Sequence, residues 1–394
     1  MTVKLLHQVG HCSNWNIDSF SLDSCGDGLI LSPVHQSATQ IESLNPELKK
    51  RAFLDPQYYL PSSQKKKLNT YNFFPEVISS GFETVNFSSF ARRSAEECIN
   101  FQIKNNFDRI IIPARYFDQM VAEYTEKQES YTVNPFLDVL RDNTSDKPIY
   151  ITLPLTSHMI TDERYRVQLL NWITTFPEIA GVYLFSSNER KTKQIADENY
   201  LLSFIEFCRE LKDAELELVV GYLNVEGLLF SLVGDISITM GAFENTRIFS
   251  LDKFLNSDDE RRGPKPRIYV PGLLNWIQFG QAKEIRSEYP EIWADIYTPT
   301  SYGEAVFNTP ADPTFNQAGL YKDFFINYSK QVSALGSLSV ANRHLNLREA
   351  LKKALVNYSK IEDAGIDLET HGGVDHIQPW LNVINRYKRK YISD

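Results

Sequence analysis

The 394-residue sequence predicts an α/β protein: a single (β/α)8 TIM barrel with an insertion or subdomain after the eighth strand and C-terminal helices. Two observations support this. Short β-rich runs alternate with helical stretches about eight times, and several runs, such as 110–112 and 218–220, are almost continuously apolar. Strands of a parallel sheet covered by helices are apolar on both faces. A doubly wound open sheet is the main alternative, because one wrongly assigned strand would break the closure.

The eight strands are expected at residues 28–34, 51–55, 83–87, 109–113, 148–154, 181–186, 217–222 and 235–241. Helix start signals lie between them. Ser94 with Glu97 has the spacing of a capping box, and Asp197 precedes a stretch with one apolar face. Asn346 with Glu349 is expected to open a last helix. We therefore expect a barrel core at 1–250, an insertion or subdomain at 251–320, and a helical region packed on the barrel at 321–394.

Composition excludes several classes of protein. The chain is 42% hydrophobic and 23% charged, which is ordinary for a globular protein. Its four cysteines are far apart and form no CxxC pair, so no zinc site or disulfide framework is expected. No cofactor is expected either. No apolar run is long enough to span a membrane, and the N-terminus lacks the order of a signal peptide. A cytoplasmic protein without membrane contact is the default expectation.

The formal charge of -9 argues against a uniformly basic nucleic-acid surface. Local basic clusters remain. A cluster of this kind is most often a solvated face or loop, and it gains meaning only if several share one rim. The candidates for contacts with a nucleic-acid backbone are Lys65, Lys66, Lys67, Arg92, Arg93, Arg190, Arg261 and Arg262.

Barrel enzymes place their chemistry at the carboxyl ends of the strands. The segments after the predicted strands are rich in amide, phenol, carboxylate and guanidinium groups, with no metal-ligand spacing and no phosphate-loop or nucleophile-elbow motif. Asp55 and Glu244 are the candidate catalytic carboxylates. The candidate substrate-binding residues are His35, Gln57, Tyr58, Asn86, Arg115, Asn188, Glu189, Tyr222 and Arg247.

Asp55 ends an apolar run and precedes Pro56, so its carboxylate is expected where the strands end. A carboxylate partly removed from water has a raised pKa and can act as a base or nucleophile. The structural alternative is an Asx-turn before Pro56. Glu244 has a similar position after the eighth strand, and its structural alternative is a rim salt bridge with Arg247.

Six segments follow one another in a recognisable order: GLILSPVHQSATQ at 28–40, LNPEL at 44–48, LDPQYYLP at 54–61, GVYLFSSNE at 181–189, GYLNVEGLLFSLVG at 221–234 and NYSK at 327–330. Through these segments and their order, the chain resembles the tRNA-guanine transglycosylase superfamily, including its relatives that act on DNA. The resemblance covers most of the chain. It implies a barrel that binds a nucleotide, with residues 181–189 in the place of the family's base-recognising segment.

The chain also departs from the family at two functional positions. The family's zinc cysteines would fall near Leu320, Lys322 and Phe325, and none of these is a cysteine, although His344 lies near the lost fourth ligand. The family's nucleophilic aspartate would fall near Ile238 or Thr239, neither of which can take that role. These departures argue against a structural zinc and against the usual covalent intermediate.

The resemblance and the missing nucleophile together predict a DNA glycosylase. It would flip a modified base, of the hypermodified kind found in phage DNA, out of the stack and hydrolyse its N-glycosidic bond. DNA is the favoured polymer and tRNA the alternative. Two other readings stay open: base exchange with Asp55 or Glu244 as a relocated nucleophile, and a non-catalytic binding subunit. A barrel acting on an unrelated small molecule also remains, and homodimerisation is left open.

Overall fold

The computed structural model describes residues 2–74, 84–118, 120, 123–143, 145–255 and 263–392, with the backbone alone for 84–90. Its centre is an eight-stranded parallel sheet in the order β3-β2-β1-β8-β7-β6-β5-β4. The end strands β3 and β4 approach each other, and the Asp108 N–H donates to the Ala52 carbonyl (2.9 Å), which brings the sheet to near closure. The strands are β1 Val3–Gln8, β2 Gly28–Leu31, β3 Ala52–Leu54, β4 Ile110–Ile112, β5 Ile149–Thr156, β6 Ile179–Ser187, β7 Glu217–Val220 and β8 Ile236–Met240.

The predicted barrel is confirmed, but one of its predicted strands is wrong. Residues 84–87 belong to the helix α4 (Thr84–Lys104), and residue 83 lies outside the described residues. The short alternation at 83–87 resembles a strand, yet the buried residues further on (Ala91, Ala95, Cys98) have helical spacing. The capping box expected at Ser94 falls inside this helix and caps nothing.

The strand that restores the count to eight is β1, which the sequence reasoning missed. Its last two residues, His7 and Gln8, are polar and yet fully buried. His7 Nε2 bonds the Cys25 carbonyl (3.0 Å), and Gln8 Oε1 accepts a hydrogen bond from the Tyr183 hydroxyl (3.1 Å). Hydrogen bonding inside the barrel thus allows a polar sequence to occupy a central strand.

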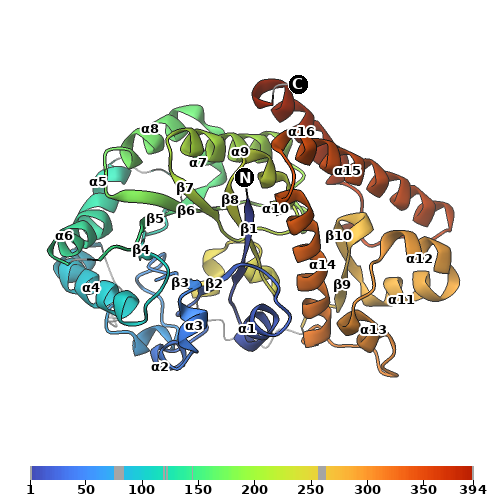
Figure 1. Ribbon diagram of the computed structural model, residues 1–394, viewed down its shortest axis with the longest axis horizontal. Helices are drawn as coiled ribbons and strands as arrows, with labels where there is room; N and C mark the ends of the chain where they lie inside the picture. The colour runs from blue at the N-terminus through green and yellow to red at the C-terminus, as the bar shows by residue number, and fades with distance from the viewer. Residues whose placement is uncertain are drawn as a thin grey trace.

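Helices between the strands cover the outside of the barrel (Figure 1). Asp197 is the N-cap of α9 as expected, because its side chain accepts a hydrogen bond from the Tyr200 N–H (2.9 Å). Helix α9 is Glu198–Asp213. The other helices of this ring are α1 Ser13–Ser21, α2 Ala38–Glu42, α3 Pro46–Lys49, α5 Tyr124–Gln128, α6 Asn134–Asp142, α7 Ser157–Thr161, α8 Glu163–Ile173 and α10 Gly227–Phe230.

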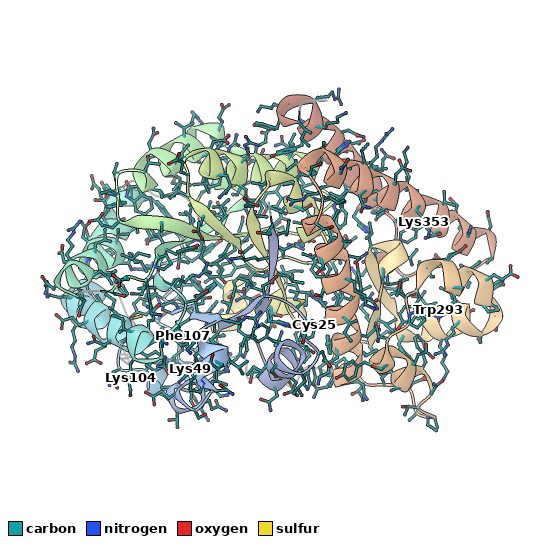
Figure 2. The ribbon with its side chains drawn as sticks, viewed as in Figure 1. Cys25, Lys49, Lys104, Phe107, Trp293 and Lys353 are labelled. Atoms are coloured by element: carbon teal, nitrogen blue, oxygen red, sulfur yellow. The ribbon has the colours of Figure 1, made fainter. Side chains whose placement is uncertain are left out.

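The C-terminal part forms a hairpin and six further helices beside the barrel. Figure 1 shows α14 (Ala318–Gly336) lying between the barrel and the antiparallel hairpin of β9 (Arg267–Val270) and β10 (Asn275–Gln278). Side chains fill the space around this hairpin, with Trp293 labelled in Figure 2. Asn346 does not open the next helix: α15 starts at Val340, capped by Ser339. The remaining helices are α11 Phe279–Glu288, α12 Pro290–Ile296, α13 Ser301–Phe307, α15 Val340–Asp363 and α16 Ile377–Tyr391.

Arg343 ties α15 to the barrel. Its guanidinium is fully buried and donates hydrogen bonds to carbonyl oxygens at three places in the chain: the end of α14, the turn before α15, and the turn that leads into β8. Two of these bonds, from Nη1 to Ser231 and Gly234, are 2.8 Å long. A buried cation satisfied by several carbonyls fixes the relative position of the segments that supply them.

We expect Arg343→Met to lower the free energy of unfolding by about 3 kcal/mol, because it leaves several buried carbonyls without a donor. Urea denaturation followed by circular dichroism measures this. Arg348→Met, on the same helix but only partly buried, is the matched control and should change the value by less than about 0.5 kcal/mol. Equal effects of the two substitutions would contradict the assignment.

Candidate active site at the barrel mouth

Asp55 lies directly after β3, at the carboxyl ends of the strands, which we call the barrel mouth. Its side chain has no exposed surface. One carboxylate oxygen accepts hydrogen bonds from the Tyr59 hydroxyl (2.5 Å) and the Gln57 N–H (3.1 Å), and the other accepts one from the Tyr183 hydroxyl (3.5 Å). The Gln57 contact is the Asx-turn that the sequence allowed. The turn and a buried, functionally placed carboxylate therefore occur together.

Lys253 is the neighbour of Asp55 that sequence reasoning missed. It lies in the short 3-10 helix Leu251–Phe254, beyond the eighth strand, and only 8% of it is exposed. Its amine donates to the Tyr222 hydroxyl (3.2 Å) and lies 4.9 Å from the centre of that ring. The available signal was a lysine inside the apolar run Phe-Ser-Leu-Asp-Lys-Phe-Leu at 249–255. We call Asp55, Tyr59, Tyr183, Tyr222 and Lys253 the mouth cluster.

Burial dominates the electrostatics of the mouth cluster. It raises the pKa of Asp55 to about 6, although the hydrogen bond from Tyr59 and the charge of Lys253 act in the opposite direction. It lowers the pKa of Lys253 to about 8, against the attraction of Asp55. Both shifts disfavour charge, so desolvation outweighs the attraction within the pair. A carboxyl and an amine that can both change protonation near neutral pH are therefore held together.

The backbone around the mouth cluster is strained. Gln57 and Tyr222 are non-glycine residues with φ of 60° and 53°, in the left-handed region that L-residues rarely adopt. Gly221 permits the close approach of the Tyr183 ring, because a Cβ there would lie 2.7 Å from it. Strain of this kind persists only where the surroundings impose it, and it concentrates at functional sites.

A cavity of 830 Å³ opens beside the mouth cluster, at the ends of β5 and β6 and the segment after β4. Its size is within the range of small-molecule sites. Polar groups dominate its lining, among them Asn188, Glu189 and His158. Asp55 does not line it. Phe249 links the cavity to the mouth cluster: it is one of the lining residues, and its ring packs on Tyr59 and Tyr222, with ring centres 5.5 and 5.2 Å apart.

The structure brings three of the predicted binding residues to Asp55 and its neighbours. Gln57 is buried, and its side-chain oxygen accepts hydrogen bonds from the Ser32 hydroxyl and the Val34 N–H (both 3.0 Å). Tyr222 belongs to the mouth cluster. His35 is nearby, and burial together with the charge of Lys253 lowers its pKa far below the ordinary value. It is therefore neutral at physiological pH.

Other predicted binding residues lie elsewhere. Tyr58 has no surface to offer a substrate, because its ring is buried against Phe73 and Phe74 and its hydroxyl bonds Ser94 (2.6 Å). Arg115 is partly buried, with its guanidinium 5.4 Å from the Phe117 ring. Asn86 lies in α4, and its side chain is outside the described residues. Tyr116, by contrast, lines the cavity and bonds Ser187 (2.6 Å).

Glu244 lies on the rim of the mouth and forms an ion pair, but with Lys193 rather than with Arg247. Burial alone would raise the pKa of Glu244, but the hydrogen bond and charge of Lys193 bring it below the ordinary value. The carboxylate is thus held ionised. Arg247 is buried over the Trp276 ring (4.1 Å), and burial lowers its pKa to about 10. Of the two candidate carboxylates, Asp55 alone has a pKa raised towards neutrality.

The predicted basic clusters do not form one continuous rim. Arg190 is buried in an ion pair with Glu226 (3.1 Å), so it is not a surface contact for phosphate. Arg92 binds Glu96 and Asp142 on the outer helices, and Arg93 is an exposed neighbour on α4. Arg261 and Arg262 lie outside the described residues. Lys65, Lys66 and Lys67 are at the mouth, where Lys67 donates to the His35 carbonyl (2.6 Å).

The zinc site of the transglycosylases does not fit this chain. Leu320 and Phe325 are buried apolar residues of α14, and Lys322 forms an ion pair with Asp18 (3.6 Å). No group of three or more His, Cys, Asp and Glu side chains among the described residues could hold a metal ion. Within the same residues, no helix combines the length and apolar character needed to cross a membrane.

Searches against family models, curated proteins and solved structures gave no significant match to this chain. The resemblance to the transglycosylase superfamily therefore stays a prediction from the sequence.

Because the pKa of Asp55 is raised in the folded protein, we expect the stability of the fold to depend on pH. Below about pH 4 the carboxyl is protonated in both the folded and the unfolded state, so its burial costs little free energy. Between pH 4 and 6 only the unfolded state ionises, and the folded state loses stability as the pH rises. Because asparagine imitates the protonated form, Asp55→Asn should gain up to about 3 kcal/mol over wild type by pH 7.

Urea unfolding at pH 4.5 and pH 7.5 measures the difference between the two proteins. Asp295→Asn is the control, because Asp295 is exposed and its hydrogen bond to Lys360 lowers its pKa. If Asp55→Asn increased the free energy of unfolding by the same amount at both pH values, this would contradict a buried carboxyl with a raised pKa.

Proposed function

We propose that the protein is a DNA glycosylase, which hydrolyses the N-glycosidic bond of a modified base and leaves an abasic site. The observation that carries this proposal is Asp55: a buried carboxylate with a pKa of about 6, held by tyrosine hydroxyls beside an 830 Å³ polar cavity. A general base works best when its pKa is close to the working pH. The resemblance to enzymes that act on nucleotides in the same kind of barrel gives the reaction class.

In the proposed reaction, the target nucleotide is flipped out of the stack, and the modified base enters the cavity. The ionised Asp55 takes a proton from a water molecule while the oxygen of that water bonds to C1′. The bond between C1′ and the base nitrogen breaks, and the base leaves with the bonding electron pair and is protonated. Positive charge develops on the sugar in between, and a desolvated carboxylate stabilises such a charge strongly.

The walls of the cavity suit a nucleobase. Tyr116 offers aromatic surface for stacking, and Asn188 and Glu189 offer hydrogen-bonding groups for a base edge. Asp55 does not line the cavity, and Phe249 both lines it and packs on Tyr59 and Tyr222, so the proposed reaction requires the Phe249 ring to move. The lysines at 65–67, near His35, supply positive charge for the phosphates of the flanking strand.

The direct test is incubation with DNA that contains modified bases, followed by an assay for alkali-labile abasic sites. We expect release of the base by wild type and a loss of at least about 100-fold in Asp55→Asn. Asp295→Asn is the surface control and should keep full activity. Equal activity of Asp55→Asn and wild type would overturn the assignment.

Two other outcomes identify the alternatives. Incorporation of a labelled free base into the DNA would mean base exchange in place of hydrolysis. Binding of DNA without abasic sites on any modified substrate would mean a non-catalytic binding subunit.

The pH dependence of the reaction follows from the same carboxyl. Because the base form of Asp55 is required, kcat/KM should fall about tenfold per pH unit below pH 6 and level off above it. Single-turnover base release between pH 4.5 and 8 measures this, with circular dichroism to verify that the fold persists at each pH. A rate that does not change between pH 5 and 7 would exclude Asp55 as the general base.

A further inference from the structure

The hydrolysis proposed above uses Asp55 and leaves Lys253 unexplained. The amine of Lys253 is buried, and its hydrogen-bond partner among the described residues is a single phenol, Tyr222. An ammonium ion has three N–H donors, and burying one with a single bond is costly. Methionine would fill the same space beside Tyr222 and Phe254 at lower cost. The chain therefore places a destabilising amine where the glycosidic bond is proposed to break.

We propose that Lys253 is a second catalytic residue, an amine nucleophile that forms an imine with C1′ of the abasic deoxyribose and makes the protein an abasic-site lyase. This inference rests on the proposed function, because hydrolysis of the base would supply the abasic sugar at the same place. The substrate class is an aldehyde: the open-chain form of the sugar that remains after base removal.

The position of Lys253 suits this step. Its amine donates to the Tyr222 hydroxyl (3.2 Å), the Asp55 carboxylate accepts from the Tyr59 hydroxyl (2.5 Å), and both phenol rings pack on Phe249, with ring centres 5.2 and 5.5 Å away, so a nucleophile and an acid–base group lie on either side of one ring. Phe249, four residues before Lys253, and Leu251, two residues before it, both line the cavity. A displacement of the Phe249 ring would thus connect the cavity to the amine as well as to the carboxylate.

The chemistry balances without a further reagent. The neutral amine of Lys253 bonds to the aldehyde carbon C1′, and a proton moves from nitrogen to the carbonyl oxygen. Loss of water then leaves the imine. Removal of a proton from C2′ breaks the bond between C3′ and its phosphate oxygen, so the 3′ phosphate leaves and the strand is cut. Water finally hydrolyses the imine and returns the free amine.

Burial of the amine favours the form that reacts. The pKa of Lys253 is lowered to about 8, so a substantial fraction is neutral at pH 7.5, whereas an exposed lysine is almost fully protonated. Asp55, with a pKa of about 6, can pass protons to and from the oxygen and carbon atoms that react. These two pKa values support the assignment of Lys253 as the nucleophile. The assignment itself depends on the position of Lys253 and Asp55 in the same mouth cluster.

The test uses a synthetic DNA duplex that already contains one abasic site, together with borohydride, which reduces an imine to a stable covalent bond. We expect wild type to become cross-linked to the duplex and, without borohydride, to cut the strand at the abasic site. Digestion and mass spectrometry of the cross-linked protein should place the adduct on Lys253.

Lys253→Met should lose cross-linking and strand cutting by at least 100-fold while the free energy of unfolding is unchanged or higher, because a buried amine is removed. Lys283→Met is the matched control. Lys283 is an exposed lysine on α11 that pairs with Asp312, and its substitution should change nothing.

No cross-link with wild type, or an adduct mapped to another lysine, would overturn the proposal even if Lys253→Met failed to fold. These outcomes are distinct from a failure of the glycosylase proposal, because the abasic site is supplied ready-made. Release of modified bases without cross-linking would mean a glycosylase without lyase activity. Cross-linking without base release would mean that the lyase acts on abasic sites made by other means.

Discussion

The rest of this site depends on one constraint: the carboxyl of Asp55 and the amine of Lys253 are both buried among the aromatic rings of the mouth cluster. Asp55 and Lys253 come from segments nearly 200 residues apart, and each is removed from water by the rings around it. Their mutual attraction does not compensate for the lost hydration, because both pKa values move towards the neutral form. The fold must therefore hold them together with stability gained elsewhere.

Closure of the barrel brings the two groups together. Asp55 follows β3, and Lys253 lies in the 3-10 helix Leu251–Phe254 after β8. Tyr59, Phe185 and Phe249 pack edge to face or tilted between them, with ring centres 4.7 to 5.5 Å apart. These rings exclude water and fix the hydroxyl donors. Away from the mouth, Arg343 and the contact of α14 with β1 supply the rigidity that a strained site needs.

The sequence predicted the barrel because its signal is repeated and local. Apolar runs such as Ile110–Ile112 identify buried strands wherever they occur, and one wrong strand at 83–87 did not change the class. The position of Asp55 could also be predicted, because the end of an apolar run in a barrel marks the mouth. Contacts between residues far apart in the sequence could not be predicted. Nothing local indicates that Glu244 pairs with Lys193, that Arg190 is buried against Glu226, or that Lys253 returns to the mouth.

In β8, the two positions at which the resemblance to the transglycosylases would place a nucleophilic aspartate hold Ile238 and Thr239. Ile238 and Thr239 are both buried in β8, and the Thr239 hydroxyl accepts a hydrogen bond from the Leu223 N–H (3.3 Å), so this strand carries no reactive group at those positions. The charged groups of the mouth lie instead on the β3 side and in the segment after β8.

The position of these charged groups has an electrostatic consequence for the proposed reaction, which builds positive charge on a sugar. Two like charges 4 Å apart repel by about 4 kcal/mol at the effective dielectric of a protein site. A fully protonated Lys253 would therefore oppose the positive charge that Asp55 is proposed to stabilise. Burial that lowers the pKa of the amine reduces this repulsion, whether the attacking group is water or the amine itself. The same desolvation that destabilises the fold thus makes a carboxylate and an amine compatible beside one developing cation.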